Sequence, residues 1–496
     1  MTAAVLGLGP GHGAVLLAAA GAALLLAAVL LAGRPGGRPS WAGGRRQGTR
    51  ITAAAVLLVA AAATAVTLLH TADLHRGPVP ALARAGGTAP EVAVELTVTG
   101  DPRTRASRTR GTTAGQTVLT VDAVVDRVTI SDGPVPVPGA ASARTHTPVT
   151  VLARGPDIDR WQRLLPSTRV AVEADVRPAG EGHDDESAAL LVAHGPPREL
   201  ASPSLPQRIA GRLREGLRTA ADGLPSDARG LLPGLVVGDT SRLPGDLLEA
   251  FRATDMAHLV AVSGANLAIV LGVLLGAPGR AATPERRGLA GFLGLSLRTT
   301  ALLGTGITLA FVTVCRPEPS VLRAAGTGLI GLLALATGRP RRALPALSGT
   351  VLLLVLLDPY LSRSFGFLLS VLATTGLLVL GPHWARALQA RGWPHHLAGA
   401  VGATAAAQAL CAPVTVVLSG HISLVAVPCN LLAELAVAPA TLLGFAVLVM
   451  EPLFPAPARL LAEVAGVPVG WLAAVARHGA DLPGLSSPGR AGRSAR

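Results

Sequence analysis

Polar side chains interrupt the apolar segments of this chain at positions where a hydrophobic residue would cost less free energy. The most concentrated group is His258, Ser263 and Asn266, with Gly264 among them, in the run MAHLVAVSGANLAIVLGVLLG. Later apolar segments carry Arg323, Asp358, Ser370, Gln408, Asn430 and Glu434. Inside a membrane, each such group needs a hydrogen-bonding partner or a water-filled cavity. The pattern fits either a polar lane through a helical bundle or a set of separate contacts between helices.

Two of these residues have a simpler alternative. Arg323 could extend to the membrane surface, and Asp358, which precedes a proline, could end a helix outside the membrane. Groupings typical of catalysis are not found in the sequence. His395 and His396 lack nearby acidic ligands, residues 182–187 (GHDDES) form a turn-rich charged loop, and Ser263 lacks the GxSxG context of a nucleophile. Without lysine, no P-loop can form. We therefore expect no enzyme activity, no cofactor and no metal.

Composition indicates a polytopic membrane protein. Half of the 496 residues are hydrophobic, and several separate apolar runs are long enough to span a bilayer. The formal net charge of +13 is weak evidence for a polyanionic partner, because the basic residues are all arginine and the composition resembles GC-rich codon bias. Cys315, Cys411 and Cys429 lie in or beside apolar runs, which predicts neither disulfides nor a metal site.

Two apolar runs, residues 13–33 and 51–69, are predicted to be membrane anchors. The loop between them carries Arg34, Arg38, Arg45, Arg46 and Arg50. By the positive-inside rule this loop is cytoplasmic, which places residues 70–206 outside the cytoplasm. If each later span crosses the membrane once, three further arginine-containing loops also lie in the cytoplasm. They carry Arg280, Arg286 and Arg287; Arg339, Arg341 and Arg342; and Arg386 and Arg391.

The composition changes over residues 70–206, from long apolar runs to short Val- and Thr-rich runs, which predicts a small β-rich domain. Val- and Thr-rich runs occur at 91–99, 117–130, 148–153, 169–176 and 188–192. Five short strands suit an OB-like barrel, a fold that often binds single-stranded nucleic acid. Trp161 is the only aromatic residue there and is expected to fill the core. The basic loop with Arg103, Arg105, Arg108 and Arg110 supplies candidates for DNA contact, although such loops are most often merely solvated.

The rest of the chain is expected to be helical. An amphipathic helix at 207–221 and a water-facing amphipathic segment in the first half of residues 239–276 precede the membrane spans. In that segment Leu247, Leu248 and Phe251 lie at helical spacing among charged residues. We expect spans at 259–275, 292–314, 321–336, 344–357, 365–380, 398–418, 425–450 and 460–476. The predicted fold is thus a polytopic α-helical membrane protein with an extracytoplasmic OB-like insert. Its parts are two anchor spans (1–69), the β-rich domain (70–206), a multi-span domain (207–480) and a disordered tail (481–496).

The run GLVVGDTSRLPGDLLEAFRATDMAHLVAVSGANLAIVLG resembles the signature of the ComEC family of competence proteins. EPSVLRA at 318–324, DPYLSRSFGFLLSVLATTGLL at 358–378 and the Gln408, Pro413 and Asn430 positions are similar too. The resemblance places Asp239, His258, Ser263, Gly264, Arg323, Gln408 and Asn430 on signature positions. Two residues depart from the pattern: Asp255 replaces a usual glycine, and Asn266 replaces a frequent histidine.

The resemblance implies an inner-membrane channel that passes single-stranded DNA into the cytoplasm during natural transformation. The alternative is a transporter of another substrate that keeps the same fold. The metallo-β-lactamase-like domain that ends many members is not expected here. The partners implied are the transported DNA, membrane lipids, a separate ATPase and a DNA receptor. A separate nuclease and a second copy of the chain are left open as further partners.

Overall fold

The computed structural model describes residues 61, 64–66, 74, 76–84, 91–106, 117–130, 142–179, 187–276, 288–338, 343–419 and 425–482. The chain divides into two compact units. One comprises Met1–Leu205 and Leu352–Ser364, and the other comprises Pro206–Val351 and Phe365–Arg496. The anchor spans (apart from a few isolated residues), the arginine loops up to residue 342, Arg108, Arg110, residues 182–186 and residues 483–496 lie outside the described residues.

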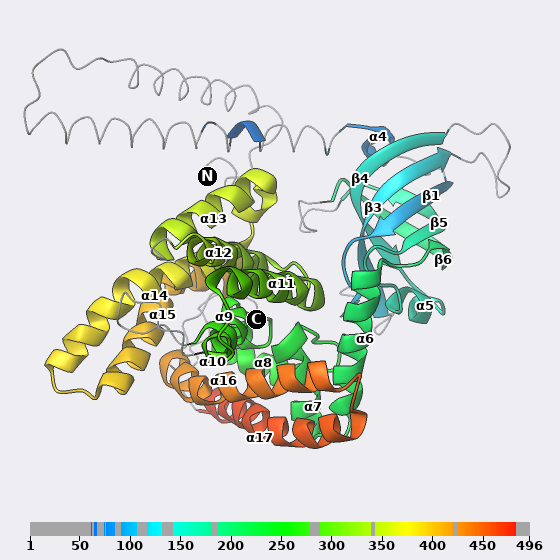
Figure 1. The fold of residues 1–496 in the computed structure, drawn as a ribbon. Coiled ribbons are helices and arrows are strands. Elements are labelled where there is room, and N and C mark those ends of the chain that lie inside the picture. Colours follow the sequence, from blue (N-terminus) through cyan, green and yellow to red (C-terminus); the bar gives the residue numbers. More distant parts are fainter. Residues whose placement is uncertain are drawn as a thin grey trace, which may run out of the picture. The chain divides into compact units, whose positions relative to one another are not determined.

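The first unit contains a mixed sheet of six described strands (Figure 1). They are β1 (Glu91–Val98), β2 (Arg103–Ala106), β3 (Thr117–Ile130), β4 (Ser142–Ala153), β5 (Arg169–Arg177) and β6 (Ala189–Ala201). Their order is β1-β5-β6-β4-β3-β2, and an additional antiparallel pairing joins β1 to β3. The pair β4–β6 is parallel, whereas the other pairs are antiparallel.

Alternation of small apolar and polar residues explains these strands. In β5, Val170, Val172, Ala174 and Val176 are buried, and the residues between them are exposed or partly exposed. Short helices α4 (Pro78–Arg84) and α5 (Ile158–Gln162) also contribute to this core. Trp161 on α5 is 1% exposed, and its Nε1 donates a hydrogen bond to the Gly195 carbonyl at 3.2 Å. Trp161 therefore fills the core, as its place in the sequence indicates.

One strand was not predicted from the sequence. The first half of the predicted basic loop, Arg103–Ala106, is strand β2, which pairs with Thr117–Thr120 of β3. Its alternating Arg and Thr residues carry no apolar face, so the pattern gave no strand signal. Pairing with the long neighbour β3 provides the hydrogen bonds that the segment needs.

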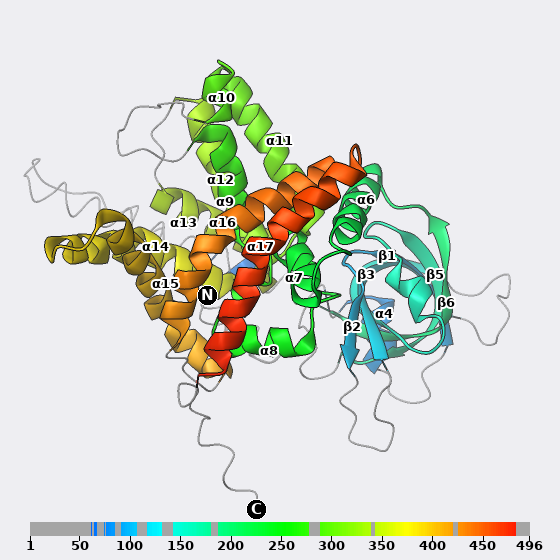
Figure 2. The same ribbon diagram turned by 90° about the horizontal axis from the view of Figure 1, so that it is seen from below.

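The second unit is helical (Figures 1 and 2). Its elements are α6 (Leu205–Ala220), α7 (Ser226–Val237), α8 (Gly245–Ala253), η2 (Ala257–Leu259), α9 (Gly264–Leu275), α10 (Leu289–Phe292), α11 (Leu297–Cys315), α12 (Pro319–Ala336), α13 (Ala343–Leu357), α14 (Phe365–Ala390), α15 (His395–Ser419), α16 (Ala426–Met450) and α17 (Pro455–Ala480). The end of α13 and the 3₁₀ turn η3 (Pro359–Ser362) fall in the first unit. Neighbouring helices pair as hairpins, α14 with α15 and α16 with α17.

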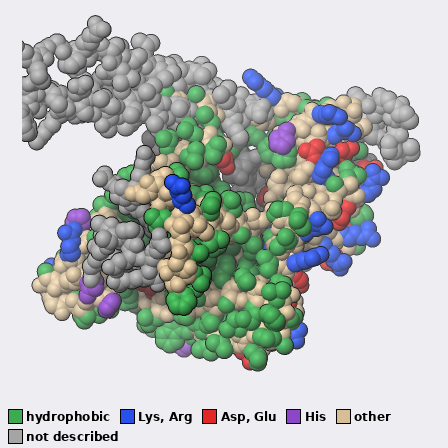
Figure 3. Space-filling view, in the orientation of Figure 1, with side chains coloured by type: hydrophobic (Ala, Val, Ile, Leu, Met, Phe, Trp, Pro, Cys, Tyr) green, Lys and Arg blue, Asp and Glu red, His purple; other side chains and the backbone are tan. Residues whose placement is uncertain are grey.

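Six of the described helices are long and apolar enough to cross a membrane: α11, α12, α14, α15, α16 and α17. Much of the hydrophobic surface on this unit is exposed, as Figure 3 shows by its green side chains. A water-soluble protein rarely exposes so large an apolar surface. The chain is therefore a multi-pass membrane protein.

Several predicted spans differ from the observed helices. The predicted span 365–380 continues to Ala390, so Arg386, which was expected in a loop, lies in α14. The predicted span 344–357 is α13, which has only 15 residues and is shorter than the six long helices.

The predicted span 259–275 is interrupted, because η2 ends at Leu259 and α9 begins at Gly264, which leaves α9 only 12 residues long. The predicted span from 292 begins at Leu297, because the preceding residues form the short helix α10. The apolar run after Val425, which the sequence left open as one span or a broken one, is one continuous helix despite Pro439.

Candidate functional site

The interruption before α9 is the centre of the candidate site. Ser263 is the N-cap residue of α9 in an extended conformation, and its side chain makes no capping hydrogen bond. Its Oγ instead donates to Oδ1 of Asn266 at 3.2 Å. Asn266 is buried, and its Nδ2 donates to the Leu235 carbonyl in α7 at 2.7 Å. Asn266 therefore anchors the broken end of α9 to the last turns of α7.

Arg323 approaches the same point from α12. Its side chain is buried, and its Nε donates to Ser370 Oγ on α14 at 2.7 Å. A Cβ placed on Gly264 would lie 2.7 Å from Arg323 Nη2 and 2.9 Å from the Ala324 Cβ. These distances are below normal contact, so only glycine allows this approach at the first residue of α9.

Ser263, Gly264, Asn266, Arg323 and Ser370 thus form one group, which we call the break cluster. Four helical segments far apart in sequence, α7, α9, α12 and α14, meet there through the contacts described. Ser320 of α12 adds a further bond, from its Oγ to the Val262 carbonyl at 3.0 Å. The sequence identified the members separately, and the tertiary structure brings them together.

Gln408 lies away from the break cluster and has a different partner. Its Nε2 donates to Oδ2 of Asp255 at 2.6 Å. Asp255 has φ +56°, the left-handed conformation that usually favours glycine. The family pattern that the sequence resembles has glycine here, and Asp255 was not predicted to be a functional candidate. No local sequence pattern could identify this role, because the hydrogen-bond partner of Asp255 lies 153 residues away in the sequence.

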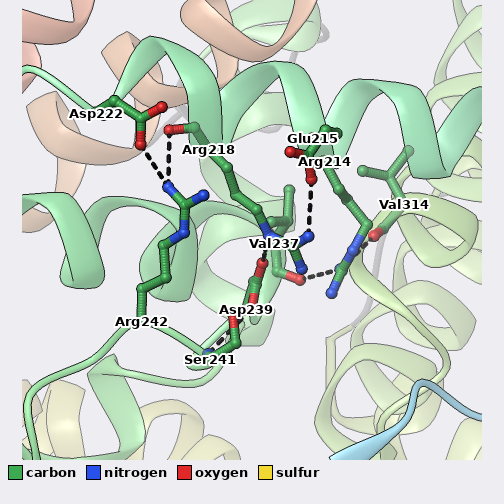
Figure 4. Close-up of polar contacts among 9 residues, drawn as sticks. All are labelled: Arg214, Glu215, Arg218, Asp222, Val237, Asp239, Ser241, Arg242 and Val314. Carbon is green, nitrogen blue, oxygen red and sulfur yellow. Dashed lines mark hydrogen bonds and ion pairs between the residues drawn. The ribbon is translucent and has the colours of Figure 1, made fainter. Parts of the chain in front are cut away.

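Asp239 takes part in an ion-pair network (Figure 4). It is buried, it pairs with Nε of Arg218 on α6, and its Oδ1 accepts a hydrogen bond from the Ser241 amide at 3.1 Å. Burial acts to raise the pKa of the Asp239 carboxyl, but the hydrogen bonds and charge of Arg218, with Ser241 and Arg214, lower it below its ordinary value. Asp239 is therefore held ionised by a structural pair.

Arg214, one turn before Arg218 on α6, binds the C-terminal ends of two other helices (Figure 4). Its Nη1 donates to the Val237 carbonyl at 2.6 Å and to the Val314 carbonyl at 2.9 Å. These carbonyls lie at the C-terminal ends of α7 and α11, where helical carbonyls lack intrahelical donors. Arg214 thus stabilises both helix ends and fixes α6 against them.

The remaining candidates are not part of the break cluster. His258 is exposed on η2 and interacts with Asp255. Asn430 donates within its own helix to Ala426, and Thr404 donates to Glu434 at 3.5 Å. Asp358 caps η3 by accepting from the Tyr360 amide at 3.1 Å, so it follows the end of α13. Arg103 is exposed on β2, and Arg105 lies on the same strand.

Metal-ligating side chains do not converge within the described part of the chain, where no group of three or more His, Cys, Asp or Glu residues could hold an ion. The three cysteines there are free thiols. The Asp239 network and the break cluster differ in net charge. The Asp239 network contains both cationic and anionic side chains, which balance. The break cluster contains the cation of Arg323 with amide and hydroxyl groups, and no carboxylate.

Comparison with known proteins gives one match. A family model described as "Competence protein" matches residues 235–489. Neither a curated protein nor a solved structure matches the chain. The matched region includes the break cluster, Asp239, Asp255 and Gln408, whereas the sheet of the first unit lies before it.

Proposed function

The chain belongs to the competence protein family, and on that premise we propose that it is the membrane channel through which single-stranded DNA enters the cytoplasm during natural transformation. The break cluster is the observation that carries this proposal. A transported polyanion needs donors along its path, because phosphate charges lose their hydration in a narrow pore. Arg323 and the interrupted start of α9 provide such donors in a region built from apolar helices.

The free-energy cost of burying the Arg323 guanidinium supports a functional role for this residue. A buried guanidinium is expensive in an apolar environment unless a charge or several hydrogen bonds compensate it. Within the described structure the Arg323 side chain makes one hydrogen bond, to the neutral hydroxyl of Ser370. Apolar residues of similar size would serve a purely structural bundle contact at lower cost. We therefore assign Arg323 to the path of the transported strand.

The sheet unit is proposed to be an OB-like domain outside the cytoplasm. The pairing of β1 with both β3 and β5, the parallel pair β4–β6 and α5 between β4 and β5 support this assignment. Arg103 and Arg105 on β2, with Arg108 and Arg110 after it, are the candidates for contact with incoming DNA. The fold alone does not establish binding, so these residues need a separate test.

The proposed partners are the transported strand, membrane lipids, an ATPase, a DNA receptor and, for degradation of the other strand, a nuclease. The chain itself is proposed not to be an enzyme and to need no cofactor. Energy coupling and strand degradation would then come from separate proteins. Homo-oligomers are also compatible with this role.

A deletion strain tests the proposed substrate. Cells that lack the chain should bind labelled double-stranded DNA at the surface but should not accumulate the labelled single strand inside, and the wild-type chain should restore entry. Normal entry without the chain would overturn the DNA-channel proposal. Loss of a different solute's transport in the same strain would favour the alternative transporter.

A further inference from the structure

We propose that the break cluster is a phosphate-binding site, formed by the N-terminus of α9 and the guanidinium of Arg323, that holds one phosphodiester group of the strand in transit. This proposal rests on the proposed DNA-channel function and adds the chemical group and the residues that hold it. Two independent features of the break cluster point to an anion.

The first feature is the open N-terminus of α9. The first N–H groups of a helix have no acceptor one turn earlier and carry partial positive charge. In α9 the Asn266 N–H donates to the Ser263 carbonyl at 3.1 Å, so the amides of Gly264 and Ala265 are the ones that an anion can reach. Ser263 occupies the N-cap position without capping these amides, because its hydroxyl bonds to Asn266 instead. The helix starts with Gly264, whose missing side chain lets another group approach the backbone closely. This is the arrangement by which helix N-termini bind phosphate.

The second feature is the cation placed against that N-terminus. Arg323 is 7% exposed, and its Nη2 lies 2.7 Å from the position that a Cβ on Gly264 would occupy. Within the described residues no acidic side chain pairs with this guanidinium, and Nε bonds to the hydroxyl of Ser370. A positive side chain and a positive helix end repel each other in an apolar environment. An anion that contacts both groups from the side would convert this repulsion into two favourable interactions.

The geometry favours a phosphodiester. A guanidinium donates from a planar fork that matches two oxygens of a phosphate group, and backbone amides can bind a third position. Ser370 accepts the hydrogen bond from Nε, and Nη2 lies beside Gly264 at the helix end. Asn266 is fixed to the Leu235 carbonyl and orients the start of α9. Free inorganic phosphate has the same chemistry, so the experiment must separate it from a DNA strand.

Binding should be measured with the full chain in lipid nanodiscs. The probes are a single-stranded oligonucleotide, the same sequence with neutral methylphosphonate linkages, and inorganic phosphate. Wild-type protein should bind the charged oligonucleotide at least about tenfold more tightly than the neutral one, because charge-assisted hydrogen bonds to phosphate are lost. No binding of the charged oligonucleotide, with phosphate bound, would overturn the DNA-channel function and leave an anion site for another solute.

Two variants test the residues. Arg323→Gln removes the charge, and Gly264→Ala adds a methyl group that would lie 2.7 Å from Arg323 Nη2 and so displaces the guanidinium from the helix end. Both should weaken binding of the charged oligonucleotide by about tenfold or more and should reduce the preference for it over the neutral one. Arg323→Lys, which keeps the charge and loses the fork, should retain an intermediate affinity.

The matched control is Gly272→Ala, because a Cβ on Gly272, also in α9, meets no atom within 4 Å. This variant should bind like the wild type. Folding is checked for each variant by gel filtration and thermal unfolding, and Arg323→Lys provides the folded comparison if Arg323→Gln is unstable. If wild-type protein prefers the charged oligonucleotide and folded Arg323→Lys and Gly264→Ala bind it unchanged, the site is wrong and the channel function stands.

Discussion

The side-chain amide of Gln408 donates a 2.6 Å hydrogen bond to the carboxylate of Asp255, which holds a left-handed backbone conformation with φ +56°. The bond joins the segment between α8 and η2 to the middle of α15. Asp255 therefore combines a backbone conformation that favours glycine with a side-chain bond that glycine could not make. The backbone strain and the side-chain bond have opposite effects on stability, and variants can separate them.

Asp255→Ala should lower the melting temperature of the purified protein more than Asp255→Gly. Alanine loses the bond to Gln408 and keeps the left-handed strain of about 1–2 kcal/mol, whereas glycine loses the bond and relieves the strain. Asp255→Asn, which tolerates this conformation and keeps an acceptor, should be closest to the wild type. Thermal unfolding in detergent measures the order, and an alanine variant as stable as the glycine variant would contradict it.

The pair between Asp239 and Arg218 should make acid stability depend on Asp239. Because the folded-state pKa lies below the ordinary value of 3.8, the pair contributes fully above that value, and its contribution is lost as the pH falls through the lower folded-state pKa. Asp239→Asn should lower the free energy of unfolding by roughly 1–3 kcal/mol at pH 7. Because the variant has no carboxylate to protonate here, it should lose less stability than the wild type below about pH 4.

Thermal unfolding between pH 3 and pH 7 tests this prediction. The control is Asp222→Asn, since Asp222 pairs with Arg242 at 2.6 Å but its side chain is 55% exposed. Exposed pairs contribute little, so this variant should unfold like the wild type at every pH. An Asp239→Asn curve parallel to that of the wild type would show that the carboxylate does not control acid stability.

Local sequence patterns predicted most elements but not their contacts. Apolar runs located the long helices, although α14 continues to Ala390, beyond its apolar part. Alternating Val residues located β3 and β5 closely, whereas only parts of β4 and β6 were predicted, because their polar ends lack that alternation. The interruption at Ser263 was missed because the surrounding residues are apolar enough for one span, although a glycine such as Gly264 allows a helix to bend or begin. The pairs Arg323–Ser370 and Asp255–Gln408 depend on tertiary packing, which no local pattern encodes.

Membrane orientation remains a prediction of the arginine pattern, and cysteine labelling tests it. In a variant whose three native cysteines are replaced by serine, Ser107→Cys should react with an impermeant thiol reagent added to intact cells. Gly43→Cys should react only after the membrane is made permeable, because its loop is expected in the cytoplasm. The reverse pattern would contradict the orientation and the proposed direction of transport.

The purified chain is predicted to leave DNA intact. Metal-dependent hydrolysis of a phosphodiester requires converging ligands, and the described residues contain no such group. Labelled single- and double-stranded DNA should survive incubation with the protein and Mg²⁺, Mn²⁺ or Zn²⁺. Degradation that copurifies with the chain and persists through further purification would disprove the prediction.

The central claim is that the transported strand passes the start of α9, and photocrosslinking tests it most directly. In the test variant, a photoreactive amino acid replaces Ala265, an exposed residue in the first turn of α9. In the control variant, it replaces Leu302 on α11, which is 73% exposed. Incoming labelled DNA with a bulky end group is stalled during uptake, in cells where both variants restore transformation. The account predicts crosslinks to DNA from position 265 and not from position 302, and equal or absent crosslinking at the two positions would contradict it.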